Sequence, residues 1–294
     1  MRDEDRRLLT GTRARHPGMI AEMAAARRRR SPHERDGQLL VIAADHPARG
    51  ALGVRGRPLA MASRTDLLDR LRTALARPGV DGLLATPDVV EDLLLLGALD
   101  DKIVIGSMNR GGLHGAAFEF DDRFTAYDTE SIAGMGLDGG KMLLRIGLRA
   151  PETAATLESC ARAVTALARA GLVALVEPFW SDRDETGVHH DMSAEGMIRA
   201  VSVGQGLGAT SAYTWLKLPV VGEMERVMEA TTLPTLLLGG DPSAAPDEVY
   251  ASWDAALRLP GVRGLVVGRA LLYPPDDDVA AAVDTAAGLL EVSR

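Results

Sequence analysis

Eight short apolar runs recur along the chain and determine the fold that it predicts. They lie at residues 39–44, 82–85, 102–107, 141–146, 172–177, 213–218, 235–239 and 264–268. Each has the length of a buried β-strand and is apolar on both of its faces. Such runs are typical of a parallel sheet that helices cover.

Amphipathic stretches follow most of the apolar runs. They lie at residues 64–77, 153–170, 193–207, 222–230, 247–259 and 276–292. Ser63, Ser193 and Pro246 are residue types that commonly begin helices, so they predict three of the helix starts. Three joins from helix to strand repeat a glycine followed by apolar residues, at residues 79–83, 171–175 and 261–265. The repeating unit is therefore a β-strand followed by an α-helix.

Eight such units in 294 residues predict an α/β fold, a (β/α)8 TIM barrel with an extra N-terminal helical segment. A doubly wound open sheet is the alternative. It would place a phosphate-binding loop after the first strand, but residues 45–50 carry no GxGxxG or GxxxxGK pattern. We expect residues 1–37 to form a helical extension and residues 38–294 to form the catalytic barrel.

Charge and cysteine content narrow the class of protein. The formal net charge of -8 argues against a nucleic-acid-binding scaffold. The basic run at residues 27–30 predicts the solvated end of an N-terminal helix rather than a nucleic-acid or membrane patch. Cys160 is the only cysteine, and neither a signal peptide nor an apolar span of about 18 residues is present. We therefore expect a cytoplasmic homo-oligomer that binds neither nucleic acid nor membranes.

Lysine is rare in a chain that uses arginine freely. Lys102, Lys141 and Lys217 are the only lysines among 33 basic residues. Arginine cannot act as a neutral amine nucleophile, whereas a desolvated lysine can. Lys217 ends an apolar run, where a charged amine is costly unless it is paired or neutral. We expect it to form a Schiff base with a carbonyl substrate; the alternative is an ion pair that stabilises the barrel.

Strand alternation brings Lys217 together with three other polar residues. Residues two apart on a strand share a face, which places Asp45, Lys141, Glu177 and Lys217 on faces that we expect to point into the barrel. Active sites of such barrels lie at the carboxyl ends of the strands. Lys141 would be a second cation that lowers the pKa of Lys217. Glu177 or Asp45 would carry protons, and the sequence leaves open which does so; Asp45 is alternatively a turn residue.

Glycines end the last two apolar runs and predict a phosphate site. Gly239 and Gly240 follow the seventh run, and Gly268 and Arg269 follow the eighth. Loops at these two places, with a helix N-terminus, form the recurrent phosphate site of the barrel fold. Glycines let backbone N–H groups approach an anion, and Arg269 would add a bidentate contact. The alternative is two tight turns and an arginine salt bridge.

Histidines and the remaining glycines give weaker signals. His46, His189, His190 and Asp191 offer metal-binding atoms, but their spacing matches no familiar zinc motif, so we expect neither a metal nor another cofactor. The glycine-rich loop at residues 109–115 is either a loop that closes over substrate or a flexible connection. The sequence assigns no role to His46, Arg110 or Arg145.

The set Asp45, Lys141, Glu177 and Lys217 resembles the class I aldolases of the tagatose-bisphosphate type, whose wider relatives are the fructose-bisphosphate and deoxyribose-phosphate aldolases. This resemblance implies that Lys217 is the Schiff-base lysine and Glu177 the acid/base, with Lys141 and Asp45 as their partners. It also implies that the glycine-ended strands and Arg269 bind phosphate. The similarity spans residues 38–290 in order and spacing, but the chain departs from it at residues 45–47, Asp-His-Pro.

The phrases SMNRGG, DGGKMLLRI, TSAYTWLKLP and LLLGGDP more closely resemble an aldolase-like (β/α)8 family associated with inositol catabolism. That resemblance implies cleavage of 2-deoxy-5-keto-gluconate 6-phosphate to dihydroxyacetone phosphate and malonate semialdehyde. Two alternatives stay open: a metal-dependent aldolase or isomerase that uses His46, Glu177 and the His189-His190 loop, and a non-catalytic barrel that binds a phosphorylated sugar.

Overall fold

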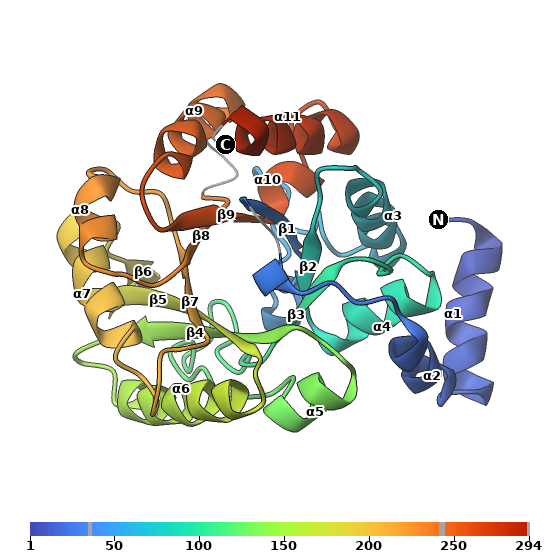
Figure 1. Cartoon of the computed structure of the whole chain (residues 1–294), viewed down its shortest axis with the longest axis horizontal. Helices are drawn as coiled ribbons and strands as arrows, with labels where there is room; N and C mark the ends of the chain where they lie inside the picture. The colour runs from blue at the N-terminus through green and yellow to red at the C-terminus, as the bar shows by residue number, and fades with distance from the viewer. Residues whose placement is uncertain (35–36, 241–244, 293–294) are drawn as a thin grey trace.

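The apolar runs form the eight parallel strands of a closed barrel in the computed structural model, which describes residues 1–34, 37–240 and 245–292 (Figure 1). Each strand pairs in parallel with the next, and β9 pairs with β1 to close the ring. The predicted (β/α)8 barrel is confirmed. Its strands are β1 Leu39–Ala43, β2 Gly82–Ala85, β3 Ile103–Ser107, β4 Gly139–Ile146, β5 Val173–Asp184, β7 Thr214–Leu218, β8 Thr235–Leu238 and β9 Val262–Val267.

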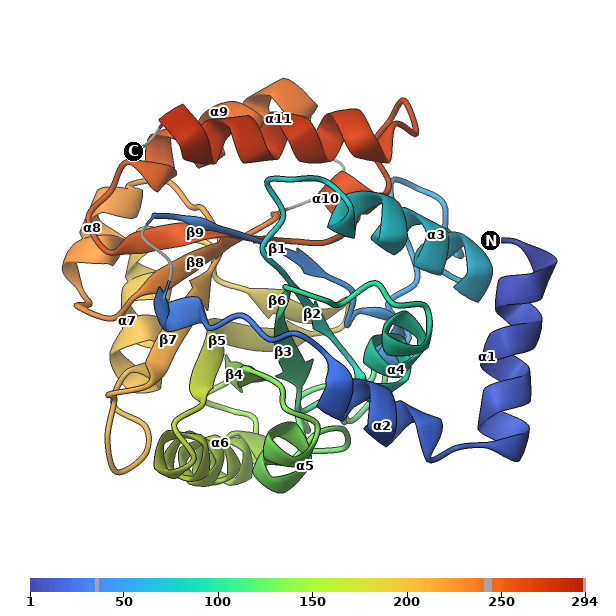
Figure 2. The same cartoon turned by 45° about the vertical axis from the view of Figure 1, so that its right-hand side comes forward.

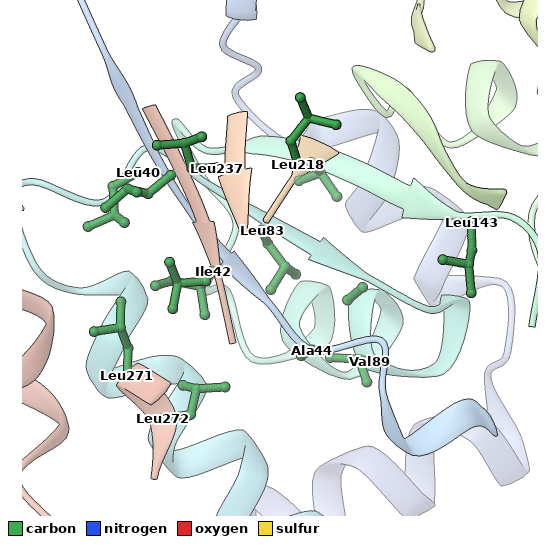
Figure 3. Close-up of a cluster of buried hydrophobic side chains, with 14 of the residues drawn as sticks. Leu40, Ile42, Ala44, Leu83, Val89, Leu143, Leu218, Leu237, Leu271 and Leu272 are labelled. Atoms are coloured by element: carbon green, nitrogen blue, oxygen red, sulfur yellow. The ribbon is translucent and has the colours of Figure 1, made fainter. Parts of the chain in front are cut away.

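Alternate residues of each strand face two separate apolar cores. On β1, Val41 and Ala43 belong to a small cluster that fills the barrel, whereas Leu40 and Ile42 pack outward with the helices (Figure 3). Val173 and Leu175 on β5 also belong to the inner cluster. This alternation aims the residues that continue the inward-facing series at the mouth of the barrel.

The helices form a ring around the strands (Figure 1). Ser63 and Ser193 cap two of them, because each hydroxyl accepts a hydrogen bond from the amide three residues on, and Pro246 is the first residue of a third. Cys160 is fully buried in its helix, and burial raises the pKa of its thiol to about 12. The ring consists of α3 Arg64–Leu75, α4 Pro87–Leu95, α5 Thr129–Gly134, α6 Glu152–Arg169, α7 Ala194–Gly204, α8 Met224–Glu229, α9 Pro246–Leu257, α10 Arg269–Leu272 and α11 Val279–Val292.

β5 continues beyond its predicted end and forms a hairpin. It passes through Pro178 to Asp184 and pairs in antiparallel fashion with β6, Gly187–His190. The interpretation of His189-His190 as part of a loop was therefore wrong. Pairing of β5 with β7 ends at Val176, while pairing with β4 runs on to Trp180. A strand with one unpaired side tolerates proline, which explains why Pro178 does not end it.

Two N-terminal helices, α1 Asp3–Arg15 and α2 Met19–Ala26, lie outside the ring, with α2 against α4 (Figure 2). The basic run that follows them departs from the predicted solvated helix end at Arg27, whereas Arg28, Arg29 and Arg30 keep exposed side chains. The Arg27 side chain is only 2% exposed, and it donates to the carbonyl oxygens of Lys102 at 2.6 Å and Gly136 at 2.7 Å.

The next three arginines also meet polar partners near the amino ends of strands. Arg28 pairs with Asp100 and Asp101, Arg29 with Asp138, and Arg30 with Asp81. The run attaches the N-terminal segment to this end of the barrel, so its positive charge is largely neutralised. None of the helices in the described ranges is long and apolar enough to span a membrane.

Candidate active site

Four residues predicted from separate strands meet at the carboxyl end of the barrel. Asp45 follows β1, Lys141 lies on β4, Glu177 on β5 and Lys217 on β7. All four are buried. Lys217 Nζ lies 2.8 Å from Glu177 Oε1, and Lys141 Nζ contacts Glu177 Oε2 and lies 3.4 Å from Asp45 Oδ2. The two lysines therefore share one carboxylate.

Asp45 is held by three donors. Arg110, from the loop after β3, contacts Asp45 Oδ2 through Nη2. Ser107 Oγ donates to the same oxygen at 3.1 Å, and Lys141 is the third donor. Arg110 Nε in turn donates to Ser107 Oγ at 2.9 Å. Arg110 thus belongs to the cluster, a position that the sequence did not assign.

Charge in this cluster is unbalanced. Lys141, Lys217 and Arg110 supply three cations against the two carboxylates of Asp45 and Glu177. Arginine keeps its proton: burial lowers the pKa of Arg110 only to about 10. Loss of one proton from a lysine would therefore balance the charges.

The pKa shifts of these side chains agree with an excess of one positive charge in the cluster. Burial lowers the pKa of Lys217, and the neighbouring Glu177 offsets this only in part. Burial also lowers the pKa of Lys141, and Arg110 lowers it further. Burial alone would raise the pKa of Glu177, but the two lysines outweigh it and hold that pKa well below its usual range. The resting site contains a carboxylate between two amines that release protons easily.

Hydrogen bonds hold the loop after β3 against the barrel. Asn109 exchanges two hydrogen bonds with the backbone of Leu143, at 2.6 and 2.7 Å. Arg145 binds both carboxylate oxygens of Asp122, at 2.8 and 2.7 Å. A Cβ at Gly112 would lie 2.7 Å from Asp122 Oδ1 and still closer to Arg145. This packing fixes the position from which Arg110 reaches Asp45.

The four residues of the predicted phosphate site lie at the ends of two neighbouring strands. Gly239 and Gly240 follow β8, and Gly268 and Arg269 follow β9, its partner in the sheet. A Cβ at Gly239 would lie 2.8 Å from a Val267 side-chain carbon, and a Cβ at Gly268 would lie 2.5 Å from a backbone oxygen, so both positions require glycine. Arg269 Nη1 donates to the Gly53 carbonyl at 3.4 Å. Asp241 lies outside the described residues.

The histidines are separated from one another. His46 Nδ1 lies 3.7 Å from an Asp45 oxygen and has no hydrogen-bond partner among the described residues. Burial, followed by the charge of Arg269, lowers the pKa of His46 well below its usual value. His190 stacks on Phe179 and bonds Ser181, while His189 bonds residues of its own hairpin. Within the described ranges, no three His, Cys, Asp or Glu residues are placed to hold one metal ion.

Solved structures with the same fold include aldolases. A Schiff base-forming fructose-1,6-bisphosphate aldolase is 18% identical, with a TM-score of 0.67 over 92% of this chain and 99% of its own. An archaeal fructose-1,6-bisphosphate aldolase, with its catalytic lysine bound to a carbinolamine intermediate, is 17% identical, with a TM-score of 0.67 over 92% and 99%. At these identities the likeness establishes the fold alone. No curated protein sequence matches the chain.

A much nearer relative is Cgl0159 from Corynebacterium glutamicum. Its crystal structure is 54% identical, with a TM-score of 0.97 over 100% of this chain and 99% of that one. The family model described as Cgl0159-like matches residues 37–287. The chain therefore belongs to the Cgl0159-like family.

Proposed function

We propose that the chain is a class I aldolase in which Lys217 forms a Schiff base with a phosphorylated ketose or keto-sugar acid. The observation that carries this proposal is the buried contact of Lys217 Nζ with Glu177, in a cluster with three cations and two carboxylates. Such a site favours a neutral amine, which is the nucleophilic form of lysine. The fold shared with a Schiff base-forming aldolase supports the same chemistry.

The reaction begins when the neutral Lys217 amine adds to the substrate carbonyl carbon. The carbonyl oxygen takes a proton to give a carbinolamine, and water then leaves to give an iminium. The iminium accepts the electron pair of the breaking carbon–carbon bond, while a base removes the proton of the departing hydroxyl group. An aldehyde leaves, the enamine takes up a proton, and water releases the ketone product and the amine.

Glu177 is placed to carry protons through these steps, because its two oxygens contact the amines of Lys217 and Lys141 separately. It can take a proton from Lys217 and return it through Lys141 without either lysine moving far. Asp45 is less suited to this task, since Arg110, Ser107 and Lys141 all bind one of its oxygens. We therefore assign Glu177 as the acid/base and Asp45 as the residue that positions Lys141.

The substrate is proposed to carry a phosphate that binds at Gly239, Gly240, Gly268 and Arg269. This set lies at the carboxyl ends of β8 and β9, one and two strands beyond Lys217 on β7. Loops after the last two strands are the usual phosphate site of this fold. The specific candidate is 2-deoxy-5-keto-gluconate 6-phosphate, cleaved to dihydroxyacetone phosphate and malonate semialdehyde.

Reductive trapping tests the proposal directly. Dihydroxyacetone phosphate with borohydride should add one reduced ketose to the protein, and peptide mapping by mass spectrometry should place it on Lys217. Borohydride without the ketose is the control. An adduct found on Lys141 alone would reverse the two lysines, and the absence of any adduct with the ketose phosphates tested would refute the mechanism.

Arg269→Ala should raise the KM for the phosphorylated substrate about 10- to 100-fold, because a charge-assisted contact contributes roughly 1.5–3 kcal/mol. Arg263 is exposed and lies on β9, the strand that precedes Arg269, so Arg263→Ala is the matched control. Inorganic phosphate should compete with substrate in the wild type and less well in Arg269→Ala. An unchanged KM would remove Arg269 from the site.

A further inference from the structure

Arg110 binds the carboxylate oxygen with which Lys141 would otherwise pair. Its Nη2 contacts Asp45 Oδ2, and Ser107 Oγ donates to the same oxygen at 3.1 Å. Lys141 Nζ lies 3.4 Å from that oxygen, which is longer than the usual N–H···O hydrogen bond. The other oxygen, Oδ1, lies 3.7 Å from His46 Nδ1, too far for a hydrogen bond. Asp45 therefore pairs mainly with Arg110.

The position of the Arg110 guanidinium is fixed by the end of β3 and the loop that follows it. Its Nε donates to Ser107 Oγ at 2.9 Å, and Ser107 is the register partner of Lys141 on the neighbouring strand. The Arg110 amide donates to Thr125 Oγ1 at 3.3 Å, across the loop. The side chain is only 5% exposed. The guanidinium thus lies beside the Lys141 amine and cannot turn into solvent without breaking these contacts.

The charged and titratable groups around the two lysine amines come from several elements of the barrel. Within the described ranges, Asp45 and Glu177 are the carboxylates that lie within 4.0 Å of either amine. The carboxylates of the loop after β3 are bound by Arg145 instead. The remaining groups are His46 and Arg49 after β1, Arg110 after β3 and Arg269 after β9. Arg110 acts on both lysines, and on Lys217 it acts more strongly than Arg49 does.

We propose that Arg110 is a positioning residue that keeps one of the two lysines in its neutral, nucleophilic form by pairing with Asp45 in place of Lys141. This inference rests on the proposed function, because it concerns the amine that attacks the substrate. With Arg110 in place, Lys141 and Lys217 share the single negative charge of Glu177. One ammonium and one amine balance that carboxylate. Because Glu177 contacts both, a proton can pass to Lys141 and leave Lys217 neutral.

Arginine is suited to this task because its guanidinium keeps its proton, whereas a lysine at the same place could lose its own and remove the excess charge. Without the guanidinium, two ammonium groups would face two carboxylates. Lys141 would pair with Asp45 and Lys217 with Glu177, and neither would release its proton easily. The pKa shifts support this account, since burial and the charge of Arg110 lower the pKa of both lysines.

The test follows the protonation of each lysine, which is practical because the chain contains only three. Protein labelled with carbon-13 at lysine Cε gives one NMR signal per lysine, and the shift of each signal reports whether the adjacent amine is charged. Single Lys→Met variants assign the signals. The titrations compare wild type with Arg110→Gln, in which the amide keeps an N–H donor without the charge. Arg123→Gln is the control, because Arg123 lies in the same loop, is 78% exposed and pairs with Asp121.

In wild type and Arg123→Gln, one of the two cluster lysines should be neutral near neutral pH, whereas in Arg110→Gln both should be charged. The pH at which the first lysine loses its proton should rise by about 1–3 units, the scale of a neighbouring charge. Borohydride trapping with dihydroxyacetone phosphate should slow about 10-fold for each such unit near neutral pH and should recover as the pH is raised. A purely structural role of Arg110 would slow trapping equally at every pH.

Removing both members of the ion pair separates charge from shape. Arg110→Gln combined with Asp45→Asn leaves two lysines against Glu177, so one excess cation is restored and the lysine signals should titrate again as in wild type. Asp45→Asn alone leaves three cations against one carboxylate, so its lysines should lose a proton at lower pH than those of the double variant. This second comparison does not require Arg110→Gln alone to fold.

The proposal is overturned if the lysines of Arg110→Gln titrate like those of Arg123→Gln, or if Asp45→Asn and the double variant titrate alike. The NMR titrations use no substrate, so they stand apart from the Schiff base. Lysine titrations that shift as expected, in a wild type that forms no adduct with the ketose phosphates tested, would refute the Schiff base and leave the effect of Arg110 on lysine protonation in place.

Discussion

The Lys217→Met variant should bind ligand but lose both turnover and reductive trapping. Methionine keeps the length and most of the volume of lysine without an amine. It also leaves Lys141 and Arg110 against Asp45 and Glu177, so the buried charges become balanced and folding should survive. Turnover should fall on the order of 10⁶-fold, the loss seen when another enzyme loses its covalent nucleophile.

Lys141→Met is the matched control for this experiment, because Lys141 is equally buried and contacts the same Glu177. It should still form the borohydride adduct at Lys217, because burial and the charge of Arg110, which lower the Lys217 pKa, remain in this variant. Intact-protein mass and calorimetric binding should be measured for both variants. Trapping that persists in Lys217→Met and vanishes in Lys141→Met would exchange the roles of the two lysines.

The barrel could be predicted from the sequence because its strands are buried on both faces. A run such as Leu39–Ala43 is apolar at every position, and this pattern differs clearly from the amphipathic helices between runs. The same reasoning located the inward-facing series that ends in Asp45 and Glu177, since side-chain direction alternates strictly along a strand. The sequence therefore predicted that four residues from different β-strand segments lie close together.

The arginines could not be placed in the same way. Arg110 lies in a loop, where no periodicity fixes the side-chain direction, and it is one of many arginines in the chain. Arg27 gave a wrong prediction because charge runs are usually solvated, whereas here carbonyl groups from distant segments surround it. The hairpin of β5 and β6 was missed because the predicted apolar run ends at Glu177 and mostly polar residues follow Trp180. For Arg27 and Arg110 the deciding contacts are far away in sequence.

Glu177→Gln should reduce turnover about 10²- to 10⁴-fold, the usual scale for losing a general acid/base. The amide keeps the shape of the side chain but cannot carry a proton, and its NH₂ group would face the ammonium of Lys217 or Lys141. Turnover should be measured well below the thermal midpoint of the variant. Glu195 is exposed and pairs with Arg226 outside the cluster, so Glu195→Gln is the control for the loss of an ion-paired carboxylate.

The same substitution should have a pH-dependent effect on stability. In this variant, Asp45 would be the one carboxylate left in the cluster with Lys141, Lys217 and Arg110. Removing one partner of a buried ion pair lowers the free energy of unfolding by about 3–5 kcal/mol near neutral pH. Glu177 raises the pKa of both lysines, so its loss lowers those values further below the 10.5 of a free lysine. The unfolded chain then binds more protons than the folded one, and the free energy of unfolding rises with pH.

The stability deficit of Glu177→Gln should therefore be largest near about pH 7 and should shrink as pH rises towards 10.5, the pKa of a free lysine. Chemical denaturation of wild type and Glu177→Gln at both ends of this pH range measures the difference in their free energies of unfolding. Adding Lys217→Met should recover part of the lost stability, because it removes one unpaired cation, but it should recover no turnover. Turnover that stays normal in Glu177→Gln would exclude proton transfer by this carboxylate. A deficit that grows with pH would show instead that neither lysine becomes neutral in the folded protein.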